Sequence, residues 1–418
     1  METGRYIVLL KDQQKASLKK IEKELEVNIT SSELLSKENR SYDIIDQDNS
    51  VLYKNLGVLV VENMDEEQLK SAVKNASNSI VYYEKEREFF PADELQLINE
   101  LKKQSAGIAE KISELEKYMT NKPLPQKSLV EMEWGLKAIG LENAQYSGKG
   151  IDICILDTGL QLSHPDFSSR EIEGKSFIDG EDWNRDPNGH GTHCAGVASG
   201  NIRNDIGKRY GIAKDCNLKI AKVLSDSGRG TTSSVIDAID WAITKKFRIL
   251  SLSLAAPVKL NDSPSVLFET IGERALENNC LIIAAAGNDS SRPQIPQPVS
   301  MPANSKSIMA VAAIDGQMKV ARFSNAGLNP STGGNVNVCA PGVDIISAYP
   351  KNSKNKSNLY YAMSGTSMAA PHVTGLAALY MEQFPDKSAK EIWELIEKRA
   401  RPIEDIKYRD IGNGLIQI

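Results

Sequence analysis

The chain contains only four histidines, and one of them has the setting of a catalytic base. His190, in the segment DPNGHGTHCAGVASG, lies between two glycines at the start of a predicted helix, where the backbone lets a substrate come close. Ser367, in MSGTSMAAPHVTGLAAL, lies just ahead of a long apolar helix, whose N-terminal amide groups favour negative charge that develops nearby. A histidine base and a serine nucleophile in these settings predict acyl transfer.

An aspartate at the end of a buried strand supplies a candidate third member. The segment IDICILDTG predicts a strand that ends at Asp157, followed by a turn at Thr158 and Gly159. Taken alone, Asp157 could be an ordinary turn residue, and Ser367 could be a helix N-cap. Asn288, directly after the apolar run that ends in AAAG, could also be a turn residue. The presence of all four in one chain favours a catalytic interpretation.

Five successive segments resemble the signature segments of the subtilisin family. They are LDTGLQLSHPDF, NGHGTHCAGVASG, SLSLAAP, AAAGND and SGTSMAAPHVTGLAAL, and they follow the family's Asp, His, Ser order. The resemblance covers roughly residues 136–418. It implies that Ser367 attacks the scissile carbonyl, that His190 transfers the proton and that Asp157 orients the imidazole. It also implies that the Asn288 side chain and the Ser367 backbone N–H bind the oxyanion.

The resemblance further implies that the substrate backbone pairs as an extended strand between segments 228–230 and 253–255. After the serine of the second segment the family commonly has Leu-Gly-Gly, whereas this chain has Leu254, Ala255 and Ala256. The added methyl groups would narrow the pocket beside the scissile bond, so the sequence leaves the specificity open. The expected substrate-binding residues are Gly228, Arg229, Gly230, Ser253, Leu254, Ala255, Ala286 and Gly287.

Calcium is the one cofactor that the resemblance suggests. Asp166 in HPDF and Asn204 in RNDIG match ligand positions of a calcium site common in the family, and oxygen donors suit that ion. Lys208 lies in the same loop and would oppose a cation there. The alternative is that Asp166 and Asn204 simply stabilise turns.

Alternating strand and helix patterns from residue 150 onward predict the scaffold that positions these side chains. The runs IDICILD, LKIAKVL, FRILSLSL, CLIIAAAG and SIMAVAAI have the near-continuous hydrophobicity of parallel strands covered on both faces. Helical patterns separate some of them, as at 231–246 and 265–279. We therefore expect an α/β fold with a doubly wound, mainly parallel sheet. Ligands collect beyond the carboxyl ends of such strands, where Asp157 and Asn288 fall.

The pattern of residues 1–90 predicts a smaller α+β domain, in which Asp65 is a helix N-cap. This domain resembles the family's ferredoxin-like propeptide, of the inhibitor I9 type, which inhibits its enzyme by laying its C-terminal tail through the cleft. The tail would lie near residues 86–90. Residues 91–130 predict a connector, with an amphipathic helix at 92–119 and a proline-marked linker. The protease domain would span 131–418.

The composition is that of an ordinary globular protein. Of 418 residues, 41% are hydrophobic, and the formal net charge of −5 leaves no cationic surplus to hold nucleic acid or a membrane surface. The five scattered cysteines favour free thiols over a disulfide framework. Together with the lack of a recognisable export signal, they predict a cytoplasmic protein, or a secreted one if a signal was trimmed.

These observations predict a serine endopeptidase that is made as an autoinhibited zymogen. Its expected partners are a protein or peptide substrate and its own N-terminal propeptide as inhibitor, with no nucleic acid and no membrane. Two alternatives stay open. One is a dedicated maturation protease for a single partner polypeptide, and the other is a catalytically silent scaffold that binds extended peptides.

Overall fold

The computed structural model describes residues 4–37, 49–62, 64–93, 131–203, 208–329, 333–350 and 359–418. The amphipathic helix predicted at 92–119 lies, except for its first two residues, outside these ranges. Within the described residues, no helix is both long enough and apolar enough to cross a membrane.

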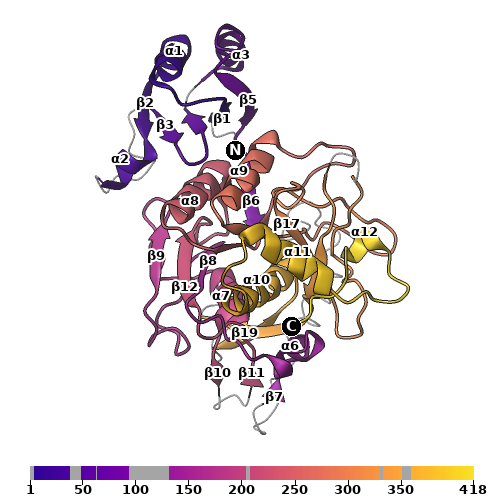
Figure 1. Cartoon of the computed structure of the whole chain (residues 1–418). Helices are drawn as coiled ribbons and strands as arrows, with labels where there is room; N and C mark the ends of the chain where they lie inside the picture. The colour runs from indigo at the N-terminus through magenta and orange to yellow at the C-terminus, as the bar shows by residue number, and fades with distance from the viewer. Residues whose placement is uncertain are drawn as a thin grey trace, which may run out of the picture.

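Within the described residues, seven parallel strands form the central sheet, in the order β18-β17-β16-β14-β8-β12-β9. Figure 1 labels β17, β8, β12 and β9 of this sheet. The five predicted apolar runs are the five inner strands, so the expected α/β architecture is confirmed. The two edge strands were not predicted, because one is the polar sequence EGKS and the other is the short, proline-containing VCAP. The strands are β8 (Asp152–Asp157), β9 (Glu173–Ser176), β12 (Asn217–Lys222), β14 (Ile249–Leu252), β16 (Leu281–Ala285), β17 (Met309–Ile314) and β18 (Val338–Pro341).

Two helices of this domain carry the histidine and serine segments and pack against each other. They are α7 (His190–Ser199) and α10 (Thr366–Gln383), and α10 also packs on β14, β16, β17 and β18. Every residue of α7 is buried. Such close packing is possible because small residues dominate both helices. The other helices are α6 (Trp134–Ala138), α8 (Thr232–Thr244), α9 (Val266–Glu277), α11 (Ala389–Arg399) and α12 (Tyr408–Ile411), with a 3₁₀ turn at Leu141–Asn143.

The start of α10 differs from the sequence expectation. Its N-cap is Gly365, so Ser367 is the second residue of the helix rather than a residue ahead of it, and it is not the N-cap serine of the simpler interpretation. Pro371 lies inside the helix, beyond the first turn where it was expected. Ser367 therefore sits within the helix N-terminus, among backbone N–H groups that have no partner inside the helix.

The N-terminal residues form a separate α+β unit with a sheet in the order β2-β3-β4-β1-β5 (Figure 1). Its four strands β3-β4-β1-β5 and two main helices have the expected ferredoxin-like arrangement, with β2 added beside β3. Asp65 caps α3 as predicted, since its side chain accepts a hydrogen bond from the Glu67 N–H at 2.8 Å. The elements are β1 (Tyr6–Leu10), α1 (Lys15–Leu25), β2 (Asn28–Ser31), α2 (Ser32–Lys37), β3 (Asn49–Tyr53), β4 (Val58–Val61), α3 (Glu66–Asn75) and β5 (Ile80–Lys85).

The N-terminal unit lies over α8 and α9 (Figure 1) and makes hydrogen bonds to both helices. Ser32 donates to the Asp240 carboxylate of α8 at 3.0 Å, and the Glu84 carboxylate accepts from the hydroxyl of Ser265, the N-cap of α9, at 3.0 Å. Glu86 accepts from the backbone N–H of Ser233 at 3.0 Å, in the first turn of α8. Carboxylates at helix N-termini are favourable because the helix dipole is positive there.

A further strand, β6 (Glu88–Pro91), leaves this unit and joins the large domain. It pairs antiparallel with β13 (Gly230–Thr231) on one side and β15 (Leu254–Ala255) on the other. The tail was expected at 86–90, but the described chain extends farther, to Asp93. The remaining short strands are β7 (Glu131–Met132), β10 (Ile202–Arg203), β11 (Lys208–Arg209), β19 (Ile345–Ala348) and β20 (Tyr360–Met363).

Candidate active site

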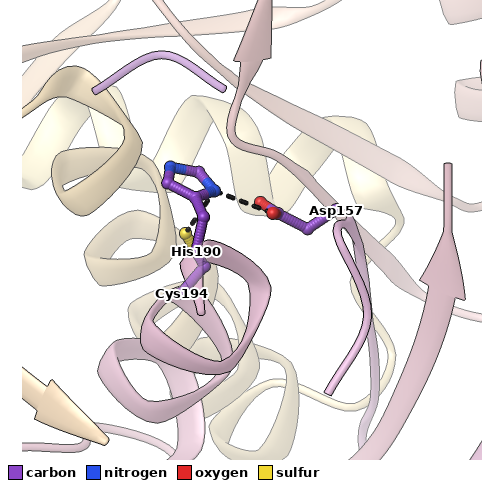
Figure 2. A group of neighbouring side chains, drawn as sticks. All are labelled: Asp157, His190 and Cys194. Carbon is purple, nitrogen blue, oxygen red and sulfur yellow. Dashed lines mark hydrogen bonds and ion pairs between the residues drawn. The ribbon is translucent and has the colours of Figure 1, made fainter. Parts of the chain in front are cut away.

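Asp157 and His190 meet at the carboxyl end of the central sheet. Asp157 is the last residue of β8 and His190 is the first residue of α7 (Figure 2). The imidazole Nδ1 lies 2.7 Å from Asp157 Oδ1, and both side chains are only 1% exposed. This contact fixes the ring orientation and leaves Nε2 pointing away from the carboxylate. Among the described residues, no hydrogen-bond partner reaches His190 Nε2.

The electrostatics around His190 favour its protonated form. Burial is the largest single effect and lowers the pKa of the imidazole, but the Asp157 carboxylate and the neighbouring Cys194 together raise it by more, so the net pKa lies well above 6.5. Cys194 is the third member of this buried group, with its sulfur 3.8 Å from His190 Nδ1 (Figure 2). Burial raises the pKa of the Cys194 thiol to about 11, so the sulfur is neutral near pH 7. Its contacts are those of a packed thiol beneath the histidine.

Ser367 is brought to the same site by α10, but its hydroxyl makes no hydrogen bond to His190. The Ser367 Oγ donates to the carbonyl oxygen of Ser253 at 2.9 Å, and the Ser253 hydroxyl donates back to the Ser367 carbonyl at 2.9 Å. Ser367 is fully buried. Because His190 Nε2 has no described partner, the serine and histidine in this state lack the hydrogen bond that base catalysis requires.

Asn288 lies beside the N-terminus of α10, three residues after β16 ends at Ala285. Its side-chain oxygen accepts from the Thr366 backbone N–H at 3.0 Å and from the Thr366 hydroxyl at 2.9 Å. These bonds orient the amide so that Nδ2 is the free end, and no hydrogen-bond partner for that nitrogen exists among the described residues. The side chain thus presents a buried, unused donor next to the Ser367 N–H.

The tail occupies the groove in front of these groups as an extended chain. The Ala92 N–H donates to the Ser253 carbonyl at 3.1 Å, and the Ala92 carbonyl oxygen accepts from the Ser367 N–H at 3.1 Å. A Cβ on Gly365 would lie 2.6 Å from that oxygen and 2.9 Å from Asp93 Cα. The tail therefore passes so close to Gly365 that a side chain at this position would collide with it. Ala92 could not be identified from the sequence, because nothing in its local pattern indicates which residue of the tail lies opposite Ser367.

The predicted substrate-binding segments flank this tail. In the first, Gly230 pairs with Phe89, Arg229 lies 3.6 Å from the Glu88 carboxylate, and Gly228 faces the Pro91 ring. In the second, Leu254 and Ala255 pair with Pro91 and Phe90, while Ser253 bonds Ala92 as described. Two more predicted residues, Ala286 and Gly287, follow β16, and a Cβ on Gly287 would collide with the Ser300 and Asn325 side chains.

The two predicted calcium ligands are not both described. Asp166 is buried, and its Oδ1 accepts from the Tyr360 hydroxyl at 3.1 Å. Asn204 lies outside the described residues. An aspartate with hard oxygen donors in a buried position fits the ligand preference of calcium.

Comparisons with known proteins agree on the class that this fold and site define. Residues 148–414 match the Subtilase family, so the chain belongs to that family. Subtilisin DY of Bacillus licheniformis is 35% identical over 283 residues, which cover 68% of this chain and 94% of that protein. The major intracellular serine protease of Bacillus subtilis (strain 168) is 34% identical over 314 residues, covering 72% of this chain and 92% of that protein.

A solved structure supports the same assignment. The crystal structure of a cold adapted subtilisin-like serine proteinase aligns with a TM-score of 0.56 and 30% sequence identity, covering 68% of this chain and 98% of the other. The chain is therefore a subtilisin-like serine endopeptidase, and it acts on protein or peptide substrates.

Proposed function

We propose that Ser367, His190 and Asp157 hydrolyse peptide bonds through an acyl-enzyme. The observation that carries this proposal is the 2.7 Å contact between Asp157 and His190 Nδ1, which leaves Nε2 directed away from the carboxylate. The Ser367 hydroxyl donates to the Ser253 carbonyl, so it must leave that acceptor before it can donate to His190 Nε2. Once deprotonated by Nε2, Oγ attacks the scissile carbonyl, and the imidazolium then protonates the leaving amine.

Two donors would stabilise the oxyanion that this attack creates. The Ser367 N–H already bonds a carbonyl oxygen, that of Ala92, and Asn288 Nδ2 is the buried donor beside it that has no described partner. Thr366 holds the Asn288 amide in place, so the donor is preorganised and needs no reorientation when charge develops.

The chain is proposed to be a zymogen in which residues 1–92 act as an inhibitory propeptide. Strand β6 supplies the residues before the proposed scissile bond, and the carbonyl oxygen of Ala92 accepts from the Ser367 N–H. The bond to be cleaved is therefore Ala92–Asp93. This refines the expected boundary at residue 90 and leaves the connector attached to the protease domain after cleavage.

The bound tail also supports a proposal about specificity. Phe89 is fully buried and packs edge to face on Phe268, with the ring centroids 5.7 Å apart. The residue at the proposed scissile bond, Ala92, is small. Ala255 and Ala256 stand where the family commonly has glycines, which agrees with a small residue at that position. We therefore expect the enzyme to prefer substrates with a small residue at the scissile bond and an aromatic residue three positions before it.

The proposal is tested by the intact mass of the full chain beside Ser367→Ala. We expect the wild type to yield a product that begins at Asp93, while the variant stays whole. Two intact chains would contradict self-processing, and a fluorophosphonate probe then decides the rest: labelling of wild type alone preserves the hydrolase, and labelling of neither supports the silent scaffold. A random peptide library separates a dedicated maturation protease, which cuts one narrow motif, from a general one.

We also propose that calcium binds at Asp166 together with Asn204. The buried carboxylate of Asp166 supports this, and bound calcium would supply stability rather than chemistry. A reducing, cytoplasmic setting is the proposed location, because all five cysteines are buried free thiols. Mass spectrometry after thiol alkylation of protein from its native cell would test the redox state.

A further inference from the structure

Asp186 is a fully buried carboxylate that lies four residues before His190 and that the mechanism above does not use. Its two oxygens accept four hydrogen bonds. Oδ1 accepts from the Thr158 hydroxyl at 2.8 Å and the Gly189 N–H at 2.9 Å, while Oδ2 accepts from the Thr192 N–H at 2.8 Å and the Thr192 hydroxyl at 2.6 Å. Three of these donors belong to the first turn of α7 or to its N-cap, Gly189.

The fourth donor, Thr158, connects the same carboxylate to the end of β8. The Thr158 N–H donates to Asp157 Oδ1 at 2.7 Å, and its hydroxyl accepts from the Gly191 N–H at 2.9 Å while donating to Asp186. Its carbonyl accepts from the buried ammonium group of Lys222 at 2.5 Å. All the polar atoms of Thr158 are therefore held: the N–H by Asp157, the hydroxyl by Asp186 and Gly191, and the carbonyl by Lys222.

We infer that Asp186 is a positioning residue, which ties the end of β8 to the first turn of α7 and so sets the distance between Asp157 and His190. The inference rests on the catalytic roles proposed above for those two residues. The two residues come from different elements, and Asp186 with Thr158 bridges the elements through buried hydrogen bonds on both sides. A carboxylate is required because four donors converge on it, and an amide would offer one oxygen and turn an N–H₂ group toward the other donors.

A matched control separates positioning from ordinary stabilisation. Glu382 also anchors a segment by its carboxylate, since its Oε2 accepts from the backbone N–H groups of residues 147–149 at 2.7–3.1 Å. That segment precedes β8 and contributes nothing to the 2.7 Å contact. Glu382→Gln should therefore lower thermal stability and leave kcat unchanged.

Two readouts are compared for Asp186→Asn and Glu382→Gln. The first is hydrolysis of a peptide substrate, where Asp186→Asn should lower kcat by about 10²-fold, the effect of misplacing a reacting group by about 1 Å, with KM unchanged. The second is the low-field proton resonance of the His190 Nδ1–H bond, recorded on the full-length chain with Ser367→Ala. We expect Asp186→Asn to broaden or shift this resonance and Glu382→Gln to preserve it.

If Asp186→Asn keeps both kcat and the resonance, the inference is overturned, and so it is if Glu382→Gln produces the same losses. Should Asp186→Asn fail to fold, Thr158→Val replaces it, because this variant cuts the link to β8 and keeps the other three bonds of Asp186. It should change the same resonance, and an unchanged resonance also overturns the inference. If the wild-type chain hydrolyses no peptide, the proposed function is refuted instead. The resonance does not depend on hydrolysis, so the two failures can be distinguished.

Discussion

The backbone N–H of Ser367 donates a 3.1 Å hydrogen bond to the carbonyl oxygen of Ala92, which lies 275 residues earlier in the sequence. Through this contact the N-terminal tail places a peptide carbonyl where an oxyanion would form. The tail is thus bound in the manner of a substrate, while the Ser367 hydroxyl is held by the Ser253 carbonyl. This arrangement connects the proposed catalytic groups with the proposed inhibition by the tail and the proposed cleavage point.

Replacing Asn288 by alanine should remove the side-chain donor to the oxyanion. We expect kcat to fall by about 10²–10³-fold with little change in KM, a range taken from subtilisin itself rather than derived from this chain. Asn278→Ala is the control, since its amide donates to the Arg274 carbonyl at the end of α9. Steady-state kinetics on one peptide substrate suffice, and equal kcat values for wild type and Asn288→Ala would refute the role.

Phe89→Ala should weaken the hold of the tail on the groove. Removing a fully buried phenylalanine costs about 3–5 kcal/mol, which corresponds to a loss of about 10²-fold to 4 × 10³-fold in affinity. After self-cleavage the tail of the variant should dissociate sooner, so the lag before peptide hydrolysis begins should be shorter than in the wild type. Phe90→Ala is the matched control, because that ring is only partly buried and faces Arg229. Equal lags for the two variants would contradict the assignment of Phe89 as the anchor.

The activity should be lost on acidification through the pKa of His190. The base must be neutral to accept the serine proton, and the Asp157 carboxylate, with a further contribution from Cys194, holds this pKa well above 6.5 against the larger single effect of burial. In Asp157→Asn the acid limb of kcat/KM should therefore move to lower pH, and kcat should fall by about 10⁴-fold, a magnitude known for subtilisin. A pH–rate profile of both proteins checks this, and coincident acid limbs would disprove it.

Buried histidines should make the protein less stable at acidic pH. Burial lowers the pKa of His193 to about 3 and that of His372 to about 4, so both are neutral in the folded chain. Below pH 6.5 the unfolded chain binds protons that the folded chain does not, and each group then lowers the unfolding free energy by up to about 1.4 kcal/mol per pH unit.

This loss should run from about pH 6.5 down to pH 4 for His372. His372→Gln is the test, and denaturant titrations at several pH values should show a shallower slope for it than for wild type. Identical slopes would mean that other groups govern the acid sensitivity.

Calcium should raise the melting temperature if Asp166 contributes to a site. An ion present at 100 times its Kd would add about 2.7 kcal/mol to the unfolding free energy. Calorimetry in calcium and in EDTA measures the difference, and Asp166→Asn should reduce it. No dependence on calcium in the wild type would eliminate the site.

The order of the elements was predictable from the sequence, and the residues for which we propose catalytic roles could be named from it. Apolar runs of strand length revealed the inner strands, because a strand buried on both faces must be apolar throughout. Asp157 and His190 stood out because each follows a recognisable local signal, a strand end or a glycine-flanked helix start. The edge strand β9 gave no such signal, since one side of it faces solvent and tolerates the polar sequence EGKS.

The sequence by itself determined which side chains could do chemistry and which segments would carry them. Only the tertiary structure decided that Ala92 is the residue that meets Ser367, that the serine hydroxyl rests on Ser253 and that Asp186 joins two elements. Local periodicity reports how each segment is buried, but the register between segments far apart in the chain depends on packing across the whole molecule. No residue pattern near position 92 or 186 encodes that register.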